Sequence, residues 1–173
     1  MEKYVPDMYQ KSIFTIDYQK LQTNGIKCIL FDLDNTIAPV NEKRPSQRVI
    51  DLFSNLKERG FIVVIFSNSH KSRLQPFKDE TGVEYCPFAC KPKSKKFYEV
   101  MNQYNVDESE VAIIGDQMLT DILGGNRVGI TTILIQPISK SDFIGTKFNR
   151  VLESIIIRRL SKKNLFYRGK FYE

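Results

Sequence analysis

The sequence predicts an α/β fold built around a central parallel β-sheet. Apolar segments of strand length alternate along the chain with segments in which apolar residues recur every three or four positions. This alternation is typical of βαβ units, in which a helix connects two parallel strands. The chain has 173 residues, of which 42% are hydrophobic and 27% charged, so its size and composition suit one globular domain with a sizeable core.

Five apolar segments are the predicted strands. The first is apolar at every position except Lys27 and shows no alternation of apolar and polar residues. A continuous apolar run of this length is typical of a parallel strand that is buried on both faces. The predicted strands cover residues 26–31, 61–66, 83–86, 111–114 and 131–135.

Helices are predicted between these strands. Ser46 begins one helix, which Gly60 ends, and a shorter helix further along is limited by Pro76. Ser94 is predicted to cap the next helix, and residues 121–128 form a short one. Two of the helices carry apolar residues along one face. These are Val49, Leu52, Phe53 and Leu56 in the first helix and Phe97, Val100, Met101 and Tyr104 in the third.

The cysteines and the beginning of the chain exclude several classes of protein. Cys28, Cys86 and Cys90 are odd in number and lack a CxxC spacing, which supports neither a disulfide framework nor a zinc site. Residues 1–6 contain no apolar leader segment, and no later apolar run approaches the length that spans a bilayer. We therefore expect a cytoplasmic protein.

Polar residues with reactive side chains follow four of the predicted strands. The carboxyl ends of parallel strands meet at one edge of a sheet, and open α/β folds bind their ligands there. We therefore expect these side chains to lie close together. They are Asp32, Asp34 and Thr36 after the first strand, Ser67 and Asn68 after the second, Lys91 after the third, and Asp116 and Asp121 after the fourth.

The order of these residues suits phosphoryl transfer. This chemistry needs a nucleophile, a proton donor for the leaving oxygen and positive charge around the phosphoryl oxygens. Asp32 can attack phosphorus and form an aspartyl-phosphate. Asp34 can protonate the leaving group and afterwards activate water. We therefore predict that Asp32 and Asp34 are the catalytic residues.

The remaining residues are predicted to bind metal and phosphate. Asp116, Asp32 and the backbone carbonyl of Asp34 would bind Mg²⁺, a hard cation that prefers oxygen ligands. Asp121 lies in the helix that follows and would orient these ligands. The phosphate-binding residues would be Thr36, Ser67, Asn68 and Lys91, with Lys93 as an alternative to Lys91.

Four segments of the chain resemble the four motifs of the haloacid dehalogenase-like (HAD) phosphohydrolases. They are DLDNT at residues 32–36, SN at 67–68, KP at 91–92 and GDQMLTD at 115–121. The resemblance implies a Rossmann-like three-layer sandwich, bound Mg²⁺, a nucleophile at Asp32 and an acid/base at Asp34. An Asp at this second position accompanies phosphatase activity in the family, whereas the dehalogenases differ there. We therefore expect a phosphatase.

The spacing of the motifs predicts a member of the superfamily without a cap domain. Residues 37–44 are too few for a domain, and residues 69–90 hold only a helix and a short strand. Capless members have no lid to close over a small metabolite and tend to act on phosphate groups presented by something large. Further residues at 25–27 and 115–126 resemble the YqeG-like subfamily of class IIIA, related to mitochondrial phosphatidylglycerophosphate phosphatases. This resemblance implies a phospholipid phosphomonoester as the substrate.

We expect one HAD-like hydrolase domain over residues 1–173. Within it, residues 1–25 form an N-terminal extension, residues 26–136 the catalytic core and residues 137–173 a basic tail. The tail has nine Lys or Arg against three Asp or Glu, whereas the rest of the chain is balanced. The formal net charge of +6 therefore belongs to the tail.

The tail is predicted to form a basic amphipathic helix. Such a helix can lie on an anionic membrane, which would place the protein peripherally at the inner face of the membrane. Two alternatives remain. The apolar stripe could pack on the sheet, or the cations could bind RNA or the ribosome in a basic binding protein whose phosphatase site is incidental or regulatory. The stripe is Phe148, Val151, Leu152 and Ile155, and the cations are Arg158, Arg159, Lys162, Lys163, Arg168 and Lys170.

Overall fold

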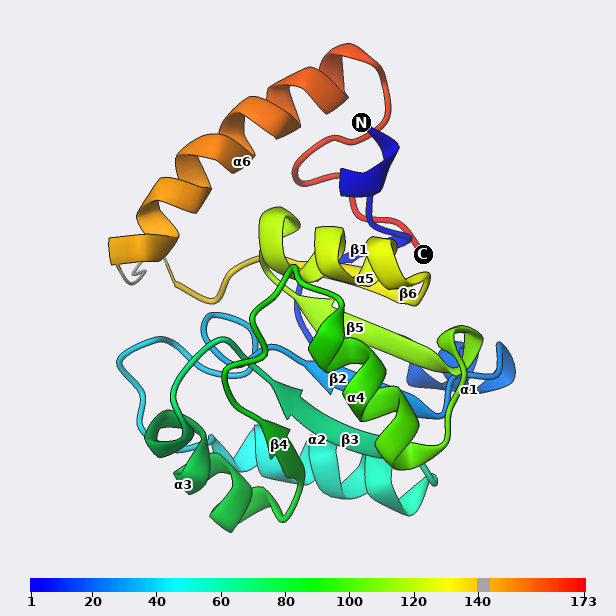
Figure 1. Ribbon diagram of the computed structural model, residues 1–173, viewed down its shortest axis with the longest axis vertical. Coiled ribbons are helices and arrows are strands. Elements are labelled where there is room, and N and C mark those ends of the chain that lie inside the picture. Colours follow the sequence, from blue (N-terminus) through cyan, green and yellow to red (C-terminus); the bar gives the residue numbers. More distant parts are fainter. Residues whose placement is uncertain (140–143) are drawn as a thin grey trace.

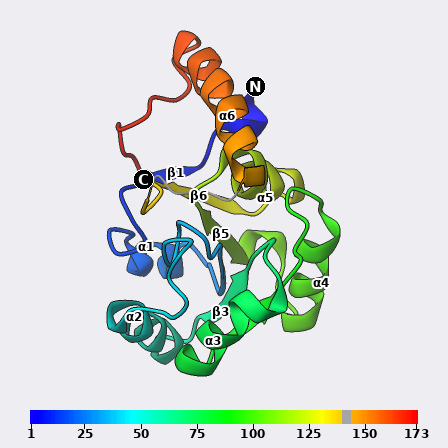
Figure 2. The ribbon, with the colours of Figure 1, turned by 90° about the vertical axis from the view of Figure 1, so that its left-hand side faces the viewer.

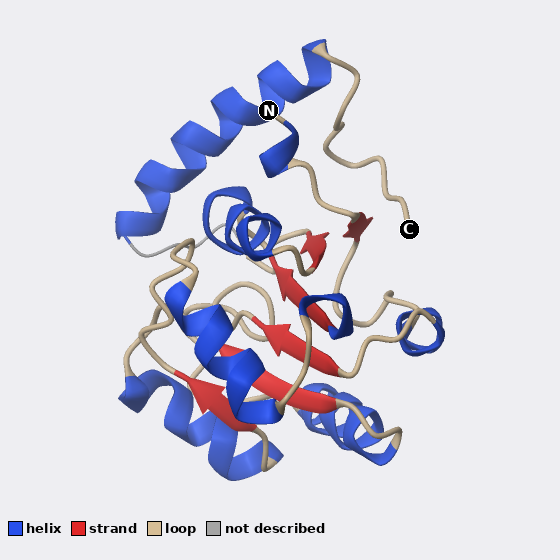
Figure 3. Cartoon of the chain, turned by 45° about the vertical axis from the view of Figure 1, so that its right-hand side comes forward, coloured by secondary structure: helices blue, strands red, loops and turns tan. Residues whose placement is uncertain are grey.

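Six parallel strands form a single sheet in the order β1-β6-β5-β2-β3-β4 (Figures 1 and 3). The computed structural model describes residues 1–139 and 144–173, and the side chains of residues 1–139 and 151–173. All five strands expected from the sequence are present, and β2 lies between β3 and β5. The strands are β1 (Met8–Gln10), β2 (Cys28–Phe31), β3 (Ile62–Phe66), β4 (Glu84–Cys86), β5 (Val111–Gly115) and β6 (Thr131–Ile135).

Helices cover both faces of the sheet, as expected for a three-layer α/β sandwich. Ile29 and Phe31 of β2 share one core with residues of α1, α2 and α3, whereas Cys28 and Leu30 point to the other face and pack with α4. This alternation of side chains along β2 explains why the whole strand is apolar. The helices are α1 (Tyr18–Thr23), α2 (Gln47–Glu58), α3 (Lys71–Thr81), α4 (Lys95–Tyr104), α5 (Leu123–Val128) and α6 (Ile144–Lys162).

The prediction that Pro76 limits a helix is wrong, because α3 continues through Pro76 and ends at Gly82. A proline inside a helix removes one hydrogen bond and costs about 3 kcal/mol. Leu74 and Phe77, on either side of Pro76, are fully buried in the core. Their burial offsets the loss, at about 1.5–3 kcal/mol for each large apolar side chain.

The two predicted helix caps behave differently. The Ser46 side chain accepts a hydrogen bond from the backbone N–H of Val49, at 3.4 Å, and begins α2 as expected. Ser94 precedes α4, but its side chain makes no capping hydrogen bond. The backbone of Ser94 already has helical φ and ψ angles, whereas a capping side chain reaches the helix from an extended backbone. The cap predicted at Ser94 is therefore wrong.

The N-terminal extension contributes an edge strand that the sequence did not predict. The three residues of β1 pair in parallel with β6 and are too few to show a periodic pattern. Tyr9 of this strand also exchanges two backbone hydrogen bonds with Tyr172, at 2.8 and 2.9 Å. The C-terminal segment therefore lies beside β1 (Figure 1).

The connections at the carboxyl edge of the sheet contain no cap domain, as predicted. Residues 32–46, between β2 and α2, and residues 67–94, between β3 and α4, are all described by the structure. Apart from loops and an isolated bridge they contain only α3 and β4. This edge of the sheet therefore carries loops and no second domain.

The predicted tail helix is α6, which lies beyond the sheet layers at one end of the molecule (Figures 1 and 3). The exposed fractions of Val151, Leu152 and Ile155 are 59%, 38% and 45%, so these residues of the stripe do not pack on the sheet. Phe148 lies outside the described side chains. Across the part of the chain that the structure describes, no helix combines the length and apolar character needed to cross a bilayer.

Candidate active site

The strand ends bring three of the predicted site residues to one edge of the sheet. Asp32 follows β2, Ser67 follows β3 and Asp116 follows β5. Because β2 pairs with both β3 and β5, these residues leave neighbouring strands. All three are buried, with exposed fractions of 7%, 2% and 3%. The sheet therefore holds reactive side chains that are far apart in the sequence close together.

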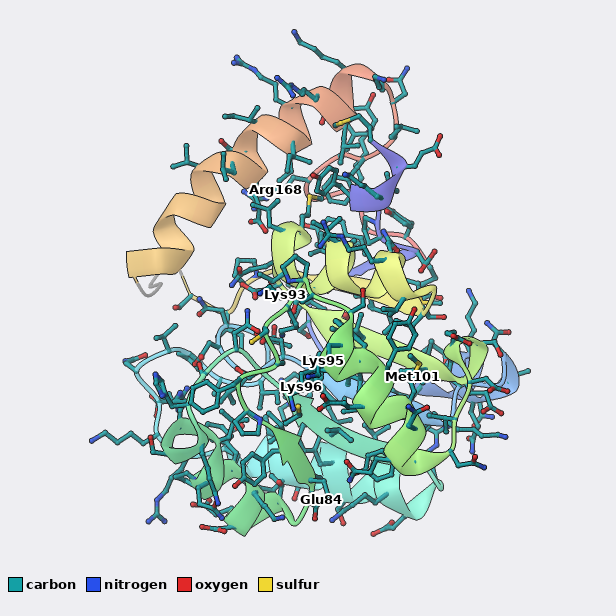
Figure 4. All side chains as sticks on the ribbon, in the orientation of Figure 1. Glu84, Lys93, Lys95, Lys96, Met101 and Arg168 are labelled. Atoms are coloured by element: carbon teal, nitrogen blue, oxygen red, sulfur yellow. The ribbon has the colours of Figure 1, made fainter. Side chains whose placement is uncertain are left out.

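Lys91 lies at the centre of this group. Its ammonium nitrogen donates hydrogen bonds to Oδ1 of Asp32 at 2.6 Å, to Oδ1 of Asp121 at 2.7 Å and to the carbonyl of Phe66 at 2.8 Å. Lys93, labelled in Figure 4, is exposed in the turn before α4. Lys91 is therefore the lysine that lies among the buried carboxylates.

Asn68 holds the backbone of Lys91 from both sides. Its side-chain oxygen accepts from the Lys91 N–H at 2.8 Å, and its side-chain nitrogen donates to the Lys91 carbonyl at 3.1 Å. Asn68 itself is exposed. The amide predicted to bind phosphate therefore also fixes the position of the buried lysine.

Burial controls the ionisation of the central pair. Removal from water raises the pKa of Asp32 to about 7. The charge of Lys91 opposes this rise in the pKa, whereas the charge of the neighbouring Asp121 adds to it. Burial alone would lower the pKa of Lys91. The negative charges of Asp121 and Asp32, and the hydrogen bonds that these residues accept, outweigh the effect of burial and raise the pKa. Lys91 is therefore a fixed positive charge.

Three carboxylates form a cluster that could hold a metal ion. Asp32, Asp116 and Asp121 each offer an oxygen, and these oxygens lie within 4.8 Å of one another. The second oxygen of Asp121 accepts from the Gln117 N–H at 3.1 Å, which fixes its orientation. A Cβ at Gly115 would overlap the side chain of Asp121, so a larger residue there would displace this carboxylate. Buried carboxylate oxygens suit a hard divalent cation.

Asp34 is held separately by two residues that the sequence analysis did not identify. The Ser69 hydroxyl donates to Oδ2 of Asp34 at 2.7 Å. The guanidinium of Arg73 donates to Oδ1 from Nε at 3.1 Å and from Nη2 at 2.9 Å. Arg73 also donates to the carbonyls of Pro39 and Glu42, in the loop that follows Asp34. Arg73 is on α3, so only the packing of that helix brings it to Asp34.

Glu153 is a third residue that the sequence analysis missed. It lies on α6, is 2% exposed, and accepts hydrogen bonds from the N–H groups of Met118 at 2.5 Å and Leu119 at 3.4 Å. These residues begin the π-helical turn η3 (Met118–Ile122), which starts two residues after Asp116 and contains Asp121. The tail helix is therefore hydrogen-bonded to the turn that contains one of the clustered carboxylates, Asp121, and that follows another, Asp116.

Thr36 and His70 have contrasting surroundings. Thr36 is 1% exposed, and its hydroxyl has no hydrogen-bond partner among the described residues. His70 is exposed at the start of α3, and its ring lies edge-on to Phe88 with the ring centres 4.8 Å apart. The hydroxyl predicted to bind phosphate is thus available, whereas His70 makes an aromatic contact.

The fold is shared with solved structures, among them one described as a putative HAD superfamily (subfamily III A) hydrolase from Legionella pneumophila, with a TM-score of 0.51 at 19% identity over 65% of this chain and 67% of that one. The chain superposes with a TM-score of 0.56 on the cobalt-bound form of deoxy-D-mannose-octulosonate 8-phosphate phosphatase from Haemophilus influenzae, at 17% identity over 86% of this chain and 95% of that one. For D,D-heptose 1.7-bisphosphate phosphatase from B. bronchiseptica, complexed with magnesium and phosphate, the TM-score is 0.53, at 19% identity over 65% of this chain and 82% of that one. These likenesses define the class of fold.

Sequence comparison identifies the family within this class. Residues 2–139 match the family described as mitochondrial PGP phosphatase. The chain is 38% identical to "Probable phosphatase YqeG" of Bacillus subtilis, over 92% of this chain and 93% of that protein. It is 30% identical to "Phosphatidylglycerophosphate phosphatase 1, chloroplastic/mitochondrial" of Arabidopsis thaliana, over 93% of this chain and 49% of that protein. The chain therefore belongs to the mitochondrial PGP phosphatase family and is a phosphatase with a HAD-like fold.

Proposed function

We propose that the protein is a Mg²⁺-dependent phosphomonoester hydrolase that acts through an aspartyl-phosphate at Asp32. The observation that carries this proposal is the buried cluster in which Lys91 bonds to Asp32 and Asp121 and in which Asp32, Asp116 and Asp121 each offer an oxygen within 4.8 Å of the others. A nucleophile, a fixed cation and oxygen ligands for a metal are the components that phosphoryl transfer needs.

Each residue has a defined part in the proposed reaction. A carboxylate oxygen of Asp32 attacks phosphorus, the bond from phosphorus to the ester oxygen breaks, and Asp34 donates a proton to the leaving alcohol. Asp34 then takes a proton from water, the water oxygen bonds to phosphorus, and the phosphorus–Asp32 bond breaks to release phosphate. Lys91, Ser67, Asn68 and Thr36 hold the phosphoryl oxygens. Atoms and protons balance over the two steps.

The metal would be held by Asp32, Asp116 and the backbone carbonyl of Asp34, with Asp121 orienting the ligands or adding one. The fit rests on the chemistry of the donors, which are carboxylate oxygens gathered within 4.8 Å in a buried site. When bound, Mg²⁺ supplies positive charge that stabilises the phosphoryl oxygens in the transition state.

Metal binding is expected to release a proton near neutral pH. Because the pKa of Asp32 in the metal-free protein is raised to about 7, this carboxyl is protonated below pH 7 and the cation must displace that proton. The affinity for Mg²⁺ should therefore rise as the pH rises from 6 to 8. Calorimetric titration in two buffers of different ionisation enthalpy measures the released proton. An affinity that is independent of pH, with no proton released, contradicts this prediction.

A phospholipid phosphomonoester such as phosphatidylglycerophosphate is the proposed substrate. The absence of a cap domain in residues 32–46 and 67–94 supports a large substrate, and the name of the Arabidopsis thaliana relative supports this lipid. The test is phosphate release from phosphatidylglycerophosphate in mixed micelles, compared with sugar phosphates, nucleotides and phosphoproteins, each with Mg²⁺ and with EDTA. Faster hydrolysis of a sugar phosphate or a nucleotide would contradict the assignment of the phospholipid as the substrate. Full activity in EDTA would contradict the proposed dependence on Mg²⁺.

Arg73→Gln is expected to lower kcat by about 10²-fold with little change in KM, because a misplaced catalytic group costs about this much. The variant removes two hydrogen bonds to Asp34 and frees the loop at Pro39. The loss should be larger for an alkyl phosphate than for an aryl phosphate, since an aryl leaving group needs less protonation.

The matched control for Arg73 is Arg44→Gln. Arg44 lies in the same region, is 78% exposed at its side chain and pairs with Glu80. Exposed ion pairs of this kind contribute little, so activity should stay near that of the parent. Equal losses of activity for alkyl and aryl phosphates in the Arg73 variant contradict a role through Asp34.

A further inference from the structure

Helix α6 has two faces with different surroundings. On the inner face, Ile156, Ile157 and the fully buried Leu160 pack with a small core formed by Tyr9 and Phe166, among others. Glu153 on the same face bonds to the turn after Asp116, and it lines a small cavity together with Asp116 and Arg168. The inner face therefore fixes α6 to the catalytic domain.

The outer face of α6 is exposed and divides into an apolar half and a basic half. Val151 and Ile155 are followed at helical spacing by Arg158 and Lys162, so these four side chains form one stripe along the helix. Leu152 and Arg159 flank the stripe and are also exposed. Among the described residues, none of these three cations takes part in an ion pair.

The start of α6 lies on the same side of the molecule as the active site. Figure 1 shows this end of the helix on the side toward which the arrows of β3 and β5 point, and Figure 2 shows it coming forward in the view onto that side. Asp32, Ser67 and Asp116 follow the carboxyl ends of the strands there. A flat surface that contacts the outer face of α6 would thus lie near the candidate active site.

We propose that the outer face of α6 docks on the surface of an anionic lipid bilayer and brings the bilayer to the active site. The proposal deepens the proposed function and rests on it, because it names the surface on which a phospholipid phosphomonoester is met. An interfacial helix inserts apolar side chains between headgroups while its cations contact anionic lipids. Only a surface that offers both an apolar layer and negative charge can contact both the apolar half and the basic half of this face.

Two other partners fit the outer face less well. RNA would attract the cations but would leave Val151, Leu152 and Ile155 in water. A second copy of the chain could cover the apolar half, but a parallel pair of these helices would bring like charges together. An antiparallel pair that overlaps along the whole face would place the cations of each helix against the apolar half of the other. The bilayer is therefore the partner that the charge and the apolar residues favour together.

The first test uses a tryptophan as a reporter, because the chain contains none. In Ile155→Trp, the emission should shift to shorter wavelength when vesicles containing phosphatidylglycerol are added, and not with vesicles of phosphatidylcholine alone. Tyr98→Trp, on α4 and 43% exposed in the parent, is the matched control and should not shift. No shift at position 155, or an equal shift at both positions, overturns the proposal.

The second test separates docking from folding and catalysis. Arg158→Glu combined with Arg159→Glu should weaken binding to anionic vesicles by about tenfold or more, since each Lys or Arg near the surface contributes measurably. The same variant should hydrolyse a small aryl phosphate at the parental rate. The control with equal charge change is Lys11→Glu combined with Lys95→Glu, at two exposed lysines elsewhere, and should bind vesicles like the parent. Parental vesicle binding by the Arg158 and Arg159 variant overturns the proposal.

The remaining outcomes distinguish the two proposals. Loss of vesicle binding without loss of aryl phosphatase activity in the charge variant, together with the shift at position 155, supports docking. A parent that hydrolyses aryl phosphate but never binds vesicles overturns docking and leaves the proposed function standing. A parent that binds vesicles but hydrolyses no phosphomonoester overturns the proposed function. A concentration-dependent shift at position 155 without vesicles assigns the face to a second copy and overturns docking.

Discussion

Asp32→Asn is expected to lower phosphate release by about 10⁴-fold or more, as the removal of a catalytic nucleophile does in other enzymes. The change preserves the shape of the side chain but removes the charge that attacks phosphorus. Lys91 keeps its bonds to Asp121 and to the Phe66 carbonyl, so the fold should survive. The measurement is the initial rate on an aryl phosphate, with circular dichroism to verify folding.

The control for this variant is Asp51→Asn, at an exposed aspartate of α2. It changes the net charge equally and should leave the rate unchanged. A base-labile phosphoryl adduct that forms on the parent but not on the Asp32 variant would support the covalent step. Trapping the same adduct on Asp32→Asn, or a residual rate above about 1% of the parent, contradicts the assignment of the nucleophile.

Lys91→Met is expected to lower the free energy of unfolding by about 3–5 kcal/mol, because removing one partner leaves buried carboxylates uncompensated. The Lys91 ammonium bonds to both Asp32 and Asp121, and its side chain is 1% exposed. Activity should vanish as well, since the fixed charge near the phosphoryl oxygens is lost. Urea denaturation followed by circular dichroism measures the change in stability.

Lys93→Met is the matched control for this effect. Lys93 is two residues away, in the turn before α4, and is exposed. Its replacement should change the free energy of unfolding by less than about 0.5 kcal/mol, as is usual for exposed positions. Similar stabilities for the two methionine variants would contradict the role of Lys91 as the buried counter-ion.

The elements that were predicted well have strong local signals. The fully apolar β2 and β3 and the amphipathic α2 were recognised because their burial imposes a composition and a period on the sequence. The errors have tertiary causes. Pro76 lies within a helix because the burial of Leu74 and Phe77 on either side of it stabilises that helix. The strand β1 forms because its backbone pairs with β6. Neither of these tertiary contacts produces a pattern of residue types that can be recognised in the local sequence.

The outer face of α6 shows a related ambiguity. The stripe of Val151, Leu152 and Ile155 was recognised from its spacing, but spacing alone does not tell which face of a helix meets the core. In the structure, the other face of α6 packs on the core through Ile156, Ile157 and Leu160. The residues of the stripe are left exposed. A helix with apolar residues on two faces needs tertiary contacts to decide between them.

The sequence by itself determined the class of fold, the order of the strand-end motifs and the family, because these depend on residue types at fixed positions along the chain. Tertiary structure alone decided which side chains meet. It places Lys91, and not Lys93, among the buried carboxylates, brings Arg73 and Ser69 to Asp34, and bonds Glu153 to the turn after Asp116. The physical reason is that these contacts join residues 30 to 39 positions apart, and their geometry depends on how helices pack on the sheet.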